Sequence, residues 1–222
     1  MKVILKQWLG QLAEAGRPDE YEVKRLLARL GLQVPRGIRL AHGALDVTPD
    51  FPGPYVAKVC SPAVNHKTDS KGVFLNLGLA ELKTALRALY ERFPQTPVLV
   101  ETMVASEGPE MIVGAMVDSA FGPAVMVGAG GILTEIFQDV AFRLAPLETA
   151  EAGRMLTELK IYPVFKGYRG LQVDPDALGR LVALISRLVD ALGAPFDQLD
   201  LNPVVWSAGE WIVLDAKLIL MK

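Results

Sequence analysis

Two apolar runs near the C-terminus constrain the fold more than any other part of the chain. Leu199–Trp206 and Trp211–Lys217 are rich in residues that favour β-strands, and the dipeptide Ala208-Gly209 lies between them. This pattern predicts a β-hairpin with its turn centred on that dipeptide. The residues that then face each other are Asn202 and Asp215, Asp200 and Lys217, and Trp206 and Trp211.

Alternation of side chains along the strands divides this hairpin into a polar and an apolar face. Asn202 and Asp215 face each other on the polar side, where opposed Cβ atoms lie about 4.5–5.5 Å apart. Both offer oxygen ligands, which Mg²⁺ prefers, with phosphate and water completing its shell. The alternative is a hydrated surface hairpin, and a three-residue loop would shift the register and separate the pair. The apolar face, expected to line the core, carries Leu199, Leu201, Val205, Ile212, Leu214 and Leu218.

Composition predicts a folded protein without features that bind nucleic acid or membranes. The 222 residues are 51% hydrophobic and 22% charged, and the net charge of −2 comes without a basic block. Cys60 is the only cysteine, which excludes an internal disulfide and suits a reducing compartment. Because the N-terminus lacks a signal-peptide pattern and the uncharged run Ser119–Thr134 is too short to span a bilayer, we expect a cytoplasmic protein.

Hydrophobic periodicity and capping residues predict the main helices and strands. Asp19 and Asp174 are expected to cap helices. The strands after residue 97 are expected to form a mostly antiparallel meander. Helices are expected at 19–30, 79–92, 148–160 and 175–192, strands at 55–60, 97–103, 110–117 and 122–127, and irregular loops at 43–54 and 162–170.

Two residues in the first half of the chain are unusual in their surroundings. Lys58 is a charge inside the apolar strand 55–60, and an inward-pointing lysine needs a carboxylate or a phosphate. The alternative is a lysine that reaches solvent from an edge strand. His66 lies in the polar segment 61–73 beside Lys67, where it could act as a nucleophile or bind phosphate. The alternative is a solvated loop histidine.

Two later features indicate either phosphate binding or close packing. The segment Gly128-Ala129-Gly130-Gly131 follows a strand but lacks the spacing of a dinucleotide-binding loop. Its glycines permit a close approach to a ligand or to another strand. Arg143 lies within an apolar strand and is a second candidate for a buried cation, suited to a phosphate.

A series of motifs along the chain resembles one enzyme family. The motifs are EYEVKRLL at 20–27, YVAKV at 55–59, SPAVNHKTD at 61–69, VLVETMV at 98–104, FGPAVMVGAGGI at 121–132, DVAFRLAPL at 139–147, YPVFKGYRG at 162–170, DLNPV at 200–204 and LDAK at 214–217. Together they resemble the ATP-grasp (beta) subunit of NDP-forming acyl-CoA synthetases. This is the acetate–CoA ligase (ADP-forming) family, related to succinyl-CoA synthetase. The resemblance extends over about residues 15–220.

The resemblance implies an α+β ATP-grasp fold, in which two α/β subdomains sandwich the nucleotide. The small lobe would be residues 1–102 and the large lobe residues 103–222. The implied ligands are ATP or ADP and Mg²⁺. The implied catalytic residues are His66, as a transient phosphate acceptor, and Arg143, as a phosphate ligand. The implied binding residues are Lys58 for phosphates, Glu101, Thr102, Met103 and Val104 for adenine, Glu110 for ribose, and Asn202 and Asp215 for Mg²⁺.

The same resemblance implies that the chain is one half of an acid–thiol ligase. The other half would be a CoA-binding alpha subunit, because no CoA-binding segment is recognisable in this sequence. The expected assembly is an α₂β₂ heterotetramer. Two alternatives remain open: a nucleotide-sensing ATP-grasp module without turnover, and another ATP-grasp carboxylate ligase. The chain departs from the family at Ser70-Lys71-Gly72, where relatives have two glycines.

Overall fold

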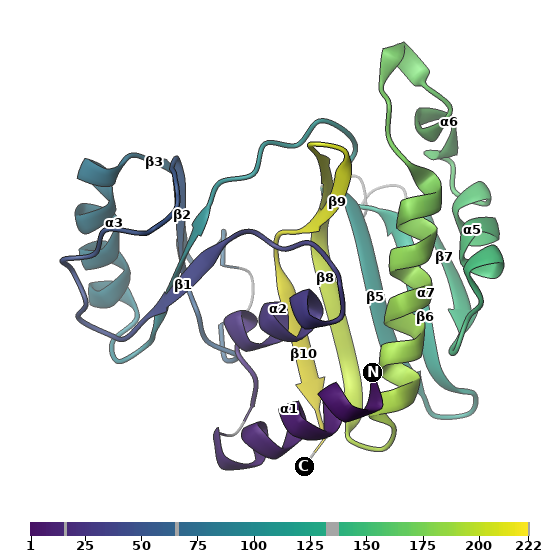
Figure 1. The fold of residues 1–222 in the computed structure, drawn as a ribbon, viewed down its shortest axis with the longest axis horizontal. Coiled ribbons are helices and arrows are strands. Elements are labelled where there is room, and N and C mark those ends of the chain that lie inside the picture. The colour runs from purple at the N-terminus through teal and green to yellow at the C-terminus, as the bar shows by residue number, and fades with distance from the viewer. Residues whose placement is uncertain (16, 65–66, 132–137, 222) are drawn as a thin grey trace. The chain divides into compact units, whose positions relative to one another are not determined.

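The chain divides into two compact units, each with its own sheet and core (Figure 1). The computed structural model describes residues 1–15, 17–64, 67–131 and 138–221. Unit 1 consists of Met1–Pro18, Val23–Val34 and Ala105–Lys222, and unit 2 consists of Asp19–Glu22 and Pro35–Val104. The helix that begins inside unit 2 therefore continues into unit 1.

Unit 2 is built on a four-stranded antiparallel sheet with the strand order β1-β4-β2-β3. Its elements are β1 (Gly37–Leu40), β2 (Tyr55–Val59), β3 (Val73–Leu77), α3 (Leu79–Arg92) and β4 (Val98–Thr102). Three leucines of the α3 stripe, Leu82, Leu86 and Leu89, are buried in one core cluster with Ala57 and Val100 of the sheet, whereas Leu79 at the start of the helix is exposed. Strand β2 is an interior strand, with β4 on one side and β3 on the other.

Unit 1 is built on a six-stranded sheet with the order β10-β8-β5-β6-β7, to which β9 adds by pairing with β8. All of these strand pairs are antiparallel. The strands are β5 (Met111–Asp118), β6 (Gly122–Ala129), β7 (Val140–Leu144), β8 (Phe196–Ser207), β9 (Glu210–Val213) and β10 (Ala216–Leu220). The helices are α1 (Lys2–Ala15), α2 (Glu20–Arg29), α5 (Thr149–Thr157), α6 (Tyr162–Phe165), α7 (Pro175–Leu192) and the 3₁₀ turn η1 (Tyr168–Gly170).

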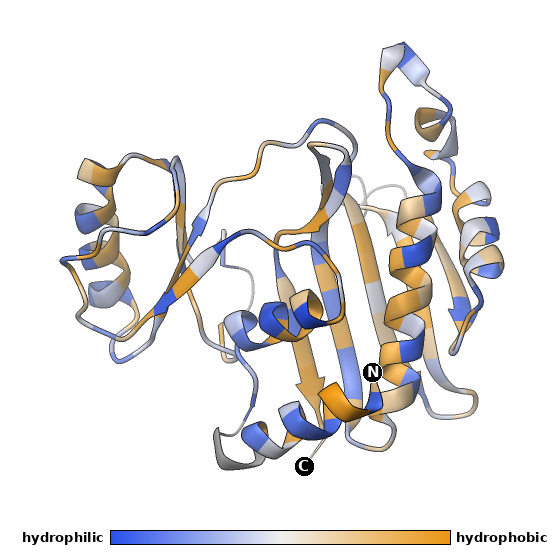
Figure 2. Ribbon diagram, in the orientation of Figure 1, coloured by the Kyte–Doolittle hydropathy of each residue, from blue (hydrophilic) through white to orange (hydrophobic). Residues whose placement is uncertain are grey.

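A single hydrophobic core holds unit 1 together. Leu5 of α1, Leu26 of α2, Leu156 of α5 and Ile185 of α7 share one buried cluster with Val113 of β5. Figure 1 shows α7 running along the sheet, and Figure 2 shows its hydrophobic residues interrupted by hydrophilic ones. This is the pattern of an amphipathic helix that buries one stripe. Among the described residues, no helix is both long and apolar enough to cross a bilayer.

The two predicted helix caps are confirmed. Asp174 Oδ1 accepts a hydrogen bond from the backbone N–H of Ala177 at 2.9 Å and starts α7. At the start of α2, the N–H of Glu22 donates to Asp19 Oδ1 at 3.0 Å, and the N–H of Asp19 donates to Glu22 Oε2 at 2.9 Å. This reciprocal pair is a capping box, which fixes the direction in which α2 begins.

Two expectations about the elements are corrected. Strand β4 pairs with β1 and β2, so it does not join the antiparallel meander that β5, β6 and β7 form. The loop after β4 leads the chain into a different sheet, which short-range patterns do not reveal. Helix α1 was not predicted, although its buried residues Leu5, Trp8 and Leu12 recur at a helical spacing.

The structural units also differ from the expected lobes, 1–102 and 103–222. The chain passes from unit 2 to unit 1 after Val104, close to the expected boundary. The segments Met1–Pro18 and Val23–Val34, however, belong to unit 1. The physical reason is that apolar residues of α1 and α2 pack into the core of unit 1.

Candidate functional site

Lys58 of β2 is buried and ion-paired, as the argument for an inward-pointing lysine required. Its side chain is only 6% exposed. Its Nζ lies 2.9 Å from Glu101 Oε2 and also forms an ion pair with Glu20. The alternative of an edge-strand lysine is wrong, because β2 lies between β3 and β4. The two carboxylates fix the position of this buried ammonium group, and a phosphate that binds it would have to compete with them.

The carboxylate of Glu101 has a role that the sequence reasoning missed. Glu101 pairs with Val56 across β2 and β4, so its side chain is a diagonal neighbour of Lys58 on the same face of the sheet. On its other side, Gly37 of β1 is opposite Glu101. A Cβ at position 37 would lie 2.7 Å from Glu101 Cγ, so this glycine leaves the space that the carboxylate occupies. The strand order, rather than any local motif, brings these residues together.

The segment expected to bind adenine ends β4 and is held by backbone bonds. The N–H of Thr102 donates to the carbonyl of Arg36 at 2.9 Å, and the N–H of Met103 donates to the carbonyl of Pro54 at 2.8 Å. Val104 follows at the end of unit 2 and is partly exposed. An adenine contact through this segment would therefore replace these bonds or use other backbone groups, and it stays a prediction.

His66, the expected phosphate acceptor, lies outside the described residues. The residue that follows it in sequence, Lys67, is described, and its Nζ lies 2.7 Å from Glu20 Oε2. The turn after Lys67 is held by backbone bonds, because the N–H of Gly72 donates to the carbonyl of Lys67 at 2.6 Å. Both Lys58 and Lys67 thus contact the same carboxylate.

Cys60, at the end of β2, is a buried and unreactive thiol. Burial raises its pKa to about 12, and the nearby carboxylate of Asp19 adds to the shift. The thiolate is the reactive form of cysteine, so Cys60 is almost entirely protonated at neutral pH. We assign it no chemical role.

The register of the C-terminal hairpin is as predicted. Asp200 pairs with Lys217 across β8 and β10, and Trp206 pairs with Trp211 across β8 and β9. Between these pairs, the N–H of Asn202 donates to the carbonyl of Asp215 at 3.2 Å. The two residues expected to bind Mg²⁺ are therefore neighbours across the strands.

The expected core face of this hairpin is only half right. Leu199, Leu201 and Leu218 belong to the core cluster of unit 1, and Val205 is buried outside that cluster, at 1% exposed. Ile212 and Leu214 are only partly buried. Beyond Asn202 the core residues are instead Val204, Trp206, Trp211 and Val213.

A bulge in β8 accounts for this change of face. Val113 of β5 pairs with Leu201, whereas Met111 pairs with Val204, so β8 contains one residue more than β5 over this stretch. An extra residue reverses which side chains face the core. Leu201 and Val204 can therefore both point inward, and the bulge lies at Asn202 and Pro203.

The donors at this bulge fit a magnesium ion. Asn202 is exposed and Asp215 is partly exposed, and they offer an amide oxygen and carboxylate oxygens. Mg²⁺ is commonly bound by one or two protein oxygens, with phosphate oxygens and water as its other ligands. In the described parts of the chain, no group of three or more His, Cys, Asp or Glu residues could hold a metal by itself. The pair is therefore suited to a metal that arrives with a phosphorylated ligand.

Glu110 lies against the glycine-rich segment. The N–H of Gly130 donates to the carbonyl of Glu110 at 2.7 Å, and a Cβ on Gly131 would lie 3.0 Å from Glu110 Oε2. A Cβ on Gly128 would lie 2.5 Å from the carbonyl oxygen of Asp139. At these positions the glycines permit backbone packing, which was one of the two expected reasons for them. Glu110 itself is exposed, and its ribose role stays a prediction.

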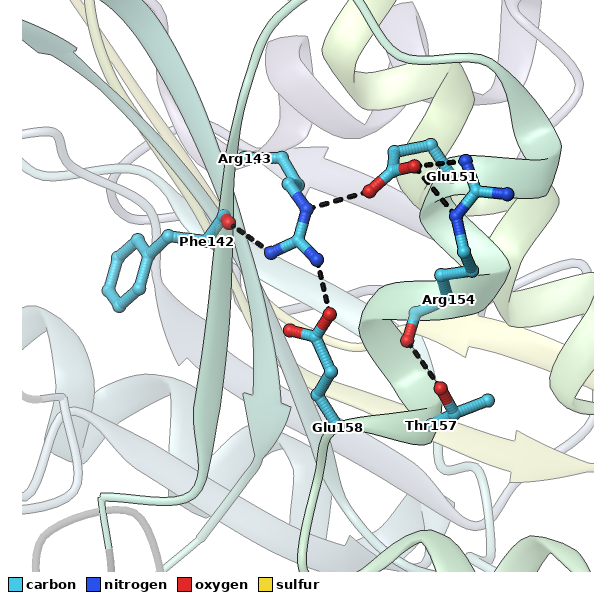
Figure 3. Close-up of polar contacts among 6 residues, drawn as sticks. All are labelled: Phe142, Arg143, Glu151, Arg154, Thr157 and Glu158. Atoms are coloured by element: carbon cyan, nitrogen blue, oxygen red, sulfur yellow. Dashed lines mark hydrogen bonds and ion pairs between the residues drawn. The ribbon is translucent and has the colours of Figure 1, made fainter.

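Arg143 is not the buried cation that its apolar strand suggested (Figure 3). It lies on β7, at the edge of the sheet, and its side chain is 31% exposed. Its Nε donates to Glu151 at 2.7 Å, a terminal nitrogen donates to Glu158, and the other donates to the carbonyl of Phe142 at 2.8 Å. The side chain reaches helix α5 from the edge strand, and the periodic pattern could not show that this strand is an edge.

Charge pairing at this edge changes two ionisation equilibria. Glu158 and then Glu151 raise the pKa of Arg143 above its ordinary value. Arg143 and then Arg154 lower the pKa of Glu151 below 4.5. In this arrangement the guanidinium joins β7 to α5, and a phosphate would have to compete with both carboxylates for it.

Comparison with known proteins agrees with the fold and with the family expected from the sequence. The pattern of the ATP-grasp domain family matches residues 12–220. The beta subunit of acetate–CoA ligase [ADP-forming] II from Pyrococcus furiosus is 37% identical over 214 residues, which cover 90% of each chain. The beta subunit of the form I enzyme from the same organism is 35% identical over 213 residues, with the same coverage.

Solved structures show the same fold. A Pyrococcus horikoshii protein superimposes with a TM-score of 0.88 at 35% identity, and the match covers 100% of this chain and 99% of that one. Acetyl-coenzyme A synthetase 1 of Ca. Korarchaeum cryptofilum superimposes with a TM-score of 0.82 at 33% identity over 97% of this chain and 99% of that one. That structure contains coenzyme A and Mg-AMPPCP, and its phosphohistidine segment points towards the nucleotide binding site. The present chain belongs to the ATP-grasp family, within the group of the beta subunits of ADP-forming acetate–CoA ligases.

Proposed function

We propose that this chain is the nucleotide-binding beta subunit of an ADP-forming acyl-CoA synthetase, an acid–thiol ligase. The complete enzyme would convert acyl-CoA, ADP and phosphate reversibly to the free acid, CoA and ATP. One observation carries the proposal: the similarity to the beta subunit of acetate–CoA ligase [ADP-forming] II from Pyrococcus furiosus extends over 90% of both chains. The buried Lys58 and the neighbouring Asn202 and Asp215 support it, because they suit a phosphate and a magnesium ion.

Phosphoryl transfer of this kind depends mainly on positioning and charge neutralisation. Lys58 would bind the nucleotide phosphates, since its amine is fixed by Glu20 and Glu101 before the ligand arrives. The segment from Glu101 to Val104 would hold the adenine, and Glu110 the ribose. His66 would accept the phosphate, because an imidazole nitrogen is a good nucleophile near neutral pH.

Asn202 and Asp215 would hold the magnesium ion. When bound, the ion would neutralise charge on the phosphate oxygens. The contribution of the protein would be the register of the hairpin, in which Asn202 and Asp215 are neighbours across the strands and offer an amide and a carboxylate. Arg143 is the less supported of the two proposed phosphate ligands. Like Lys58 it is ion-paired with two carboxylates, but unlike Lys58 it lies partly exposed at the edge of its sheet.

The enzyme needs a second subunit in this proposal. The relatives that match over most of their length are named as beta subunits, which implies a partner chain. We propose that the partner binds CoA and that the assembly is α₂β₂. The cytoplasmic location expected from the sequence stays a prediction.

The direct test is ATP formation from acetyl-CoA, ADP, phosphate and Mg²⁺. The purified chain is assayed alone and again together with the protein that co-purifies with it from its own cells. We expect ATP only when both are present. Activity of the chain alone would contradict the need for a partner, and ADP binding without turnover of any acyl-CoA in a panel of thioesters would favour a nucleotide sensor.

A further inference from the structure

A group of buried charges in unit 2 includes a residue that is not itself among the proposed nucleotide ligands. This residue is Glu20, the first residue of α2, whose side chain is 3% exposed. Its carboxylate forms ion pairs with two lysines, Lys58 of β2 and Lys67 of the segment that precedes β3, the latter at 2.7 Å. It therefore connects the strand that carries the phosphate lysine to the loop before β3.

The position of Glu20 is fixed from two sides. The capping box between Asp19 and Glu22 holds the backbone around it. Asp19 in turn forms an ion pair with Arg39 of β1, with Arg39 Nε 2.6 Å from Asp19 Oδ2. A carboxylate on such an anchored helix start has little freedom, so it can hold its partners in place.

The segment after Lys67 depends on where Lys67 lies. The carbonyl of Lys67 accepts from the N–H of Gly72 at 2.6 Å and from Ser70 Oγ at 3.2 Å. The carbonyl of Gly72 accepts from the N–H of Val59 at 2.8 Å, next to Lys58. The ion pair between Glu20 and Lys67 thus fixes the start of a turn whose end is bonded to β2.

The described contacts of the group join opposite charges. Two ammonium groups, of Lys58 and Lys67, meet two carboxylates, of Glu20 and Glu101. Loss of one partner leaves a buried charge uncompensated, which is costly, so these groups respond together. When a phosphate binds Lys58, Glu20 can keep its contact with Lys67.

We propose that Glu20 is a positioning residue for phosphoryl transfer. It acts through Lys58 and Lys67 and does not touch the nucleotide. Its carboxylate keeps the loop that begins at Lys67 in a fixed place beside the phosphate lysine. This inference deepens the proposed function and rests on it.

The first experiment measures kcat and KM for ADP in the complete two-subunit enzyme. Glu20→Gln keeps the shape of the side chain but removes the charge that holds both lysines. We expect kcat to fall about tenfold or more, the scale of one lost charge-assisted hydrogen bond, while KM for ADP does not rise. Lys67→Met should show the same fall in kcat, and Lys67→Arg, which restores the charge, should recover most of it.

The double variant separates positioning from a merely structural effect. If Glu20 acts through Lys67, adding Lys67→Met to Glu20→Gln should cause no further loss, so kcat of the double variant should equal that of the slower single variant. Losses that multiply, or kinetics like those of the wild type, would overturn the proposal. A rise in KM without a fall in kcat would overturn it as well. If Glu20→Gln does not fold, the pair Lys67→Met and Lys67→Arg still decides, because failure of Lys67→Arg to recover activity also counts against it.

A second experiment does not depend on the reaction. Trypsin cleaves after lysine, so the cleavage rate after Lys67 and Lys71 in the folded chain reports how firmly this loop is held. We expect Glu20→Gln to increase that rate and Glu22→Gln, which changes a capping carboxylate of the same helix turn, to leave it near that of the wild type. Equal rates in Glu20→Gln and the wild type would overturn the proposal. A wild-type enzyme that makes no ATP, with the difference in cleavage present, would instead refute the proposed function.

Discussion

At the scale of single residues, Asp215 is the sharpest test of the magnesium site. Asp215→Asn removes a charged oxygen ligand but keeps the size of the side chain. We expect the affinity for ADP in Mg²⁺ to fall by about 2 kcal/mol, or about thirtyfold in Kd, as for other charge-assisted contacts. Titration calorimetry with and without EDTA measures this, and the difference should vanish once the metal is removed.

A matched control lies on the same hairpin. Glu210 is an exposed carboxylate at the start of β9, away from the bulge. Glu210→Gln should bind ADP with wild-type affinity. Wild-type affinity in Asp215→Asn as well would show that the hairpin does not bind the metal.

Gly37 provides a second residue-scale prediction. A methyl group at this position would lie 2.7 Å from Glu101 Cγ and 3.0 Å from the carbonyl oxygen of Val100. Gly37→Ala should therefore lower the free energy of unfolding by about 1–3 kcal/mol, as in other overpacked sites. Urea unfolding measures it.

The control is another glycine with open surroundings. Gly10 lies on the exposed face of α1, and no atom comes within 4 Å of a Cβ built there. Gly10→Ala should stabilise the protein by about 0.5–1 kcal/mol, because alanine favours helix. Equal effects of the two substitutions would contradict the close packing of Gly37 against Glu101.

At the scale of elements, the bulge of β8 can be tested by replacing two neighbouring residues of β9, one at a time, with alanine. Val213 is 0% exposed and belongs to the core, whereas Ile212 is only partly buried. Val213→Ala should cost about 2 kcal/mol, and Ile212→Ala about 1 kcal/mol or less, although isoleucine loses more atoms. The urea midpoints of the two variants measure these losses. A larger loss for Ile212→Ala would mean that Ile212, as expected from the sequence, is the residue that faces the core.

The junction of β7 and α5 gives a prediction about pH. Arg143→Met removes both ion pairs between these elements and should lower the urea midpoint slightly, since the pairs are partly exposed. The pKa of Glu151 is lowered in the folded protein, so its stabilising contribution is present above pH 4.5 and is lost as the pH falls through the folded pKa. The difference between variant and wild type should therefore shrink as the pH falls below 4.5.

Two further measurements complete this test. Arg154 contacts Glu151 from within the same helix, so Arg154→Met should have a smaller effect on the midpoint. The affinity of Arg143→Met for ADP separates its two possible roles. An unchanged Kd means that Arg143 joins β7 to α5, and a strongly increased Kd means that it binds phosphate.

Elements with a local signature could be predicted from the sequence, and contacts between distant segments could not. Helix α3 has the bounds expected from its leucine stripe, and the hairpin register followed from one turn. The pairing of Lys58 with Glu101 depends on the order of strands in the sheet. The contact of Lys58 with Glu20 depends in addition on where α2 begins.

The bulge was missed for a different reason. Apolar residues stand on both faces of β8 after Asn202, so alternation alone could not show which of them point inward. One inserted residue reverses the face and leaves the cross-strand neighbours unchanged. The pairing of Asn202 with Asp215 was therefore predicted correctly, although the predicted core face was wrong for residues after Asn202.

At the scale of the whole molecule, nucleotide binding can be tested in each unit by itself. Lys58 belongs to unit 2, and Asn202 and Asp215 belong to unit 1. A ligand at a hundred times its Kd stabilises the state that binds it by about 2.7 kcal/mol. Hydrogen exchange with Mg·ADP should then slow in β2 and β4 and also in β8 and β10.

Removal of the metal should separate these two effects. Asn202 and Asp215 are proposed to act through Mg²⁺, whereas Lys58 is proposed to contact phosphate directly. With ADP and EDTA, the protection of β8 and β10 should therefore be lost first, and part of the protection of β2 and β4 should remain. Protection limited to one unit in the presence of Mg²⁺ would mean that the residues proposed in the other unit do not bind the nucleotide. Because exchange is read peptide by peptide, a single experiment tests both parts of the proposed site.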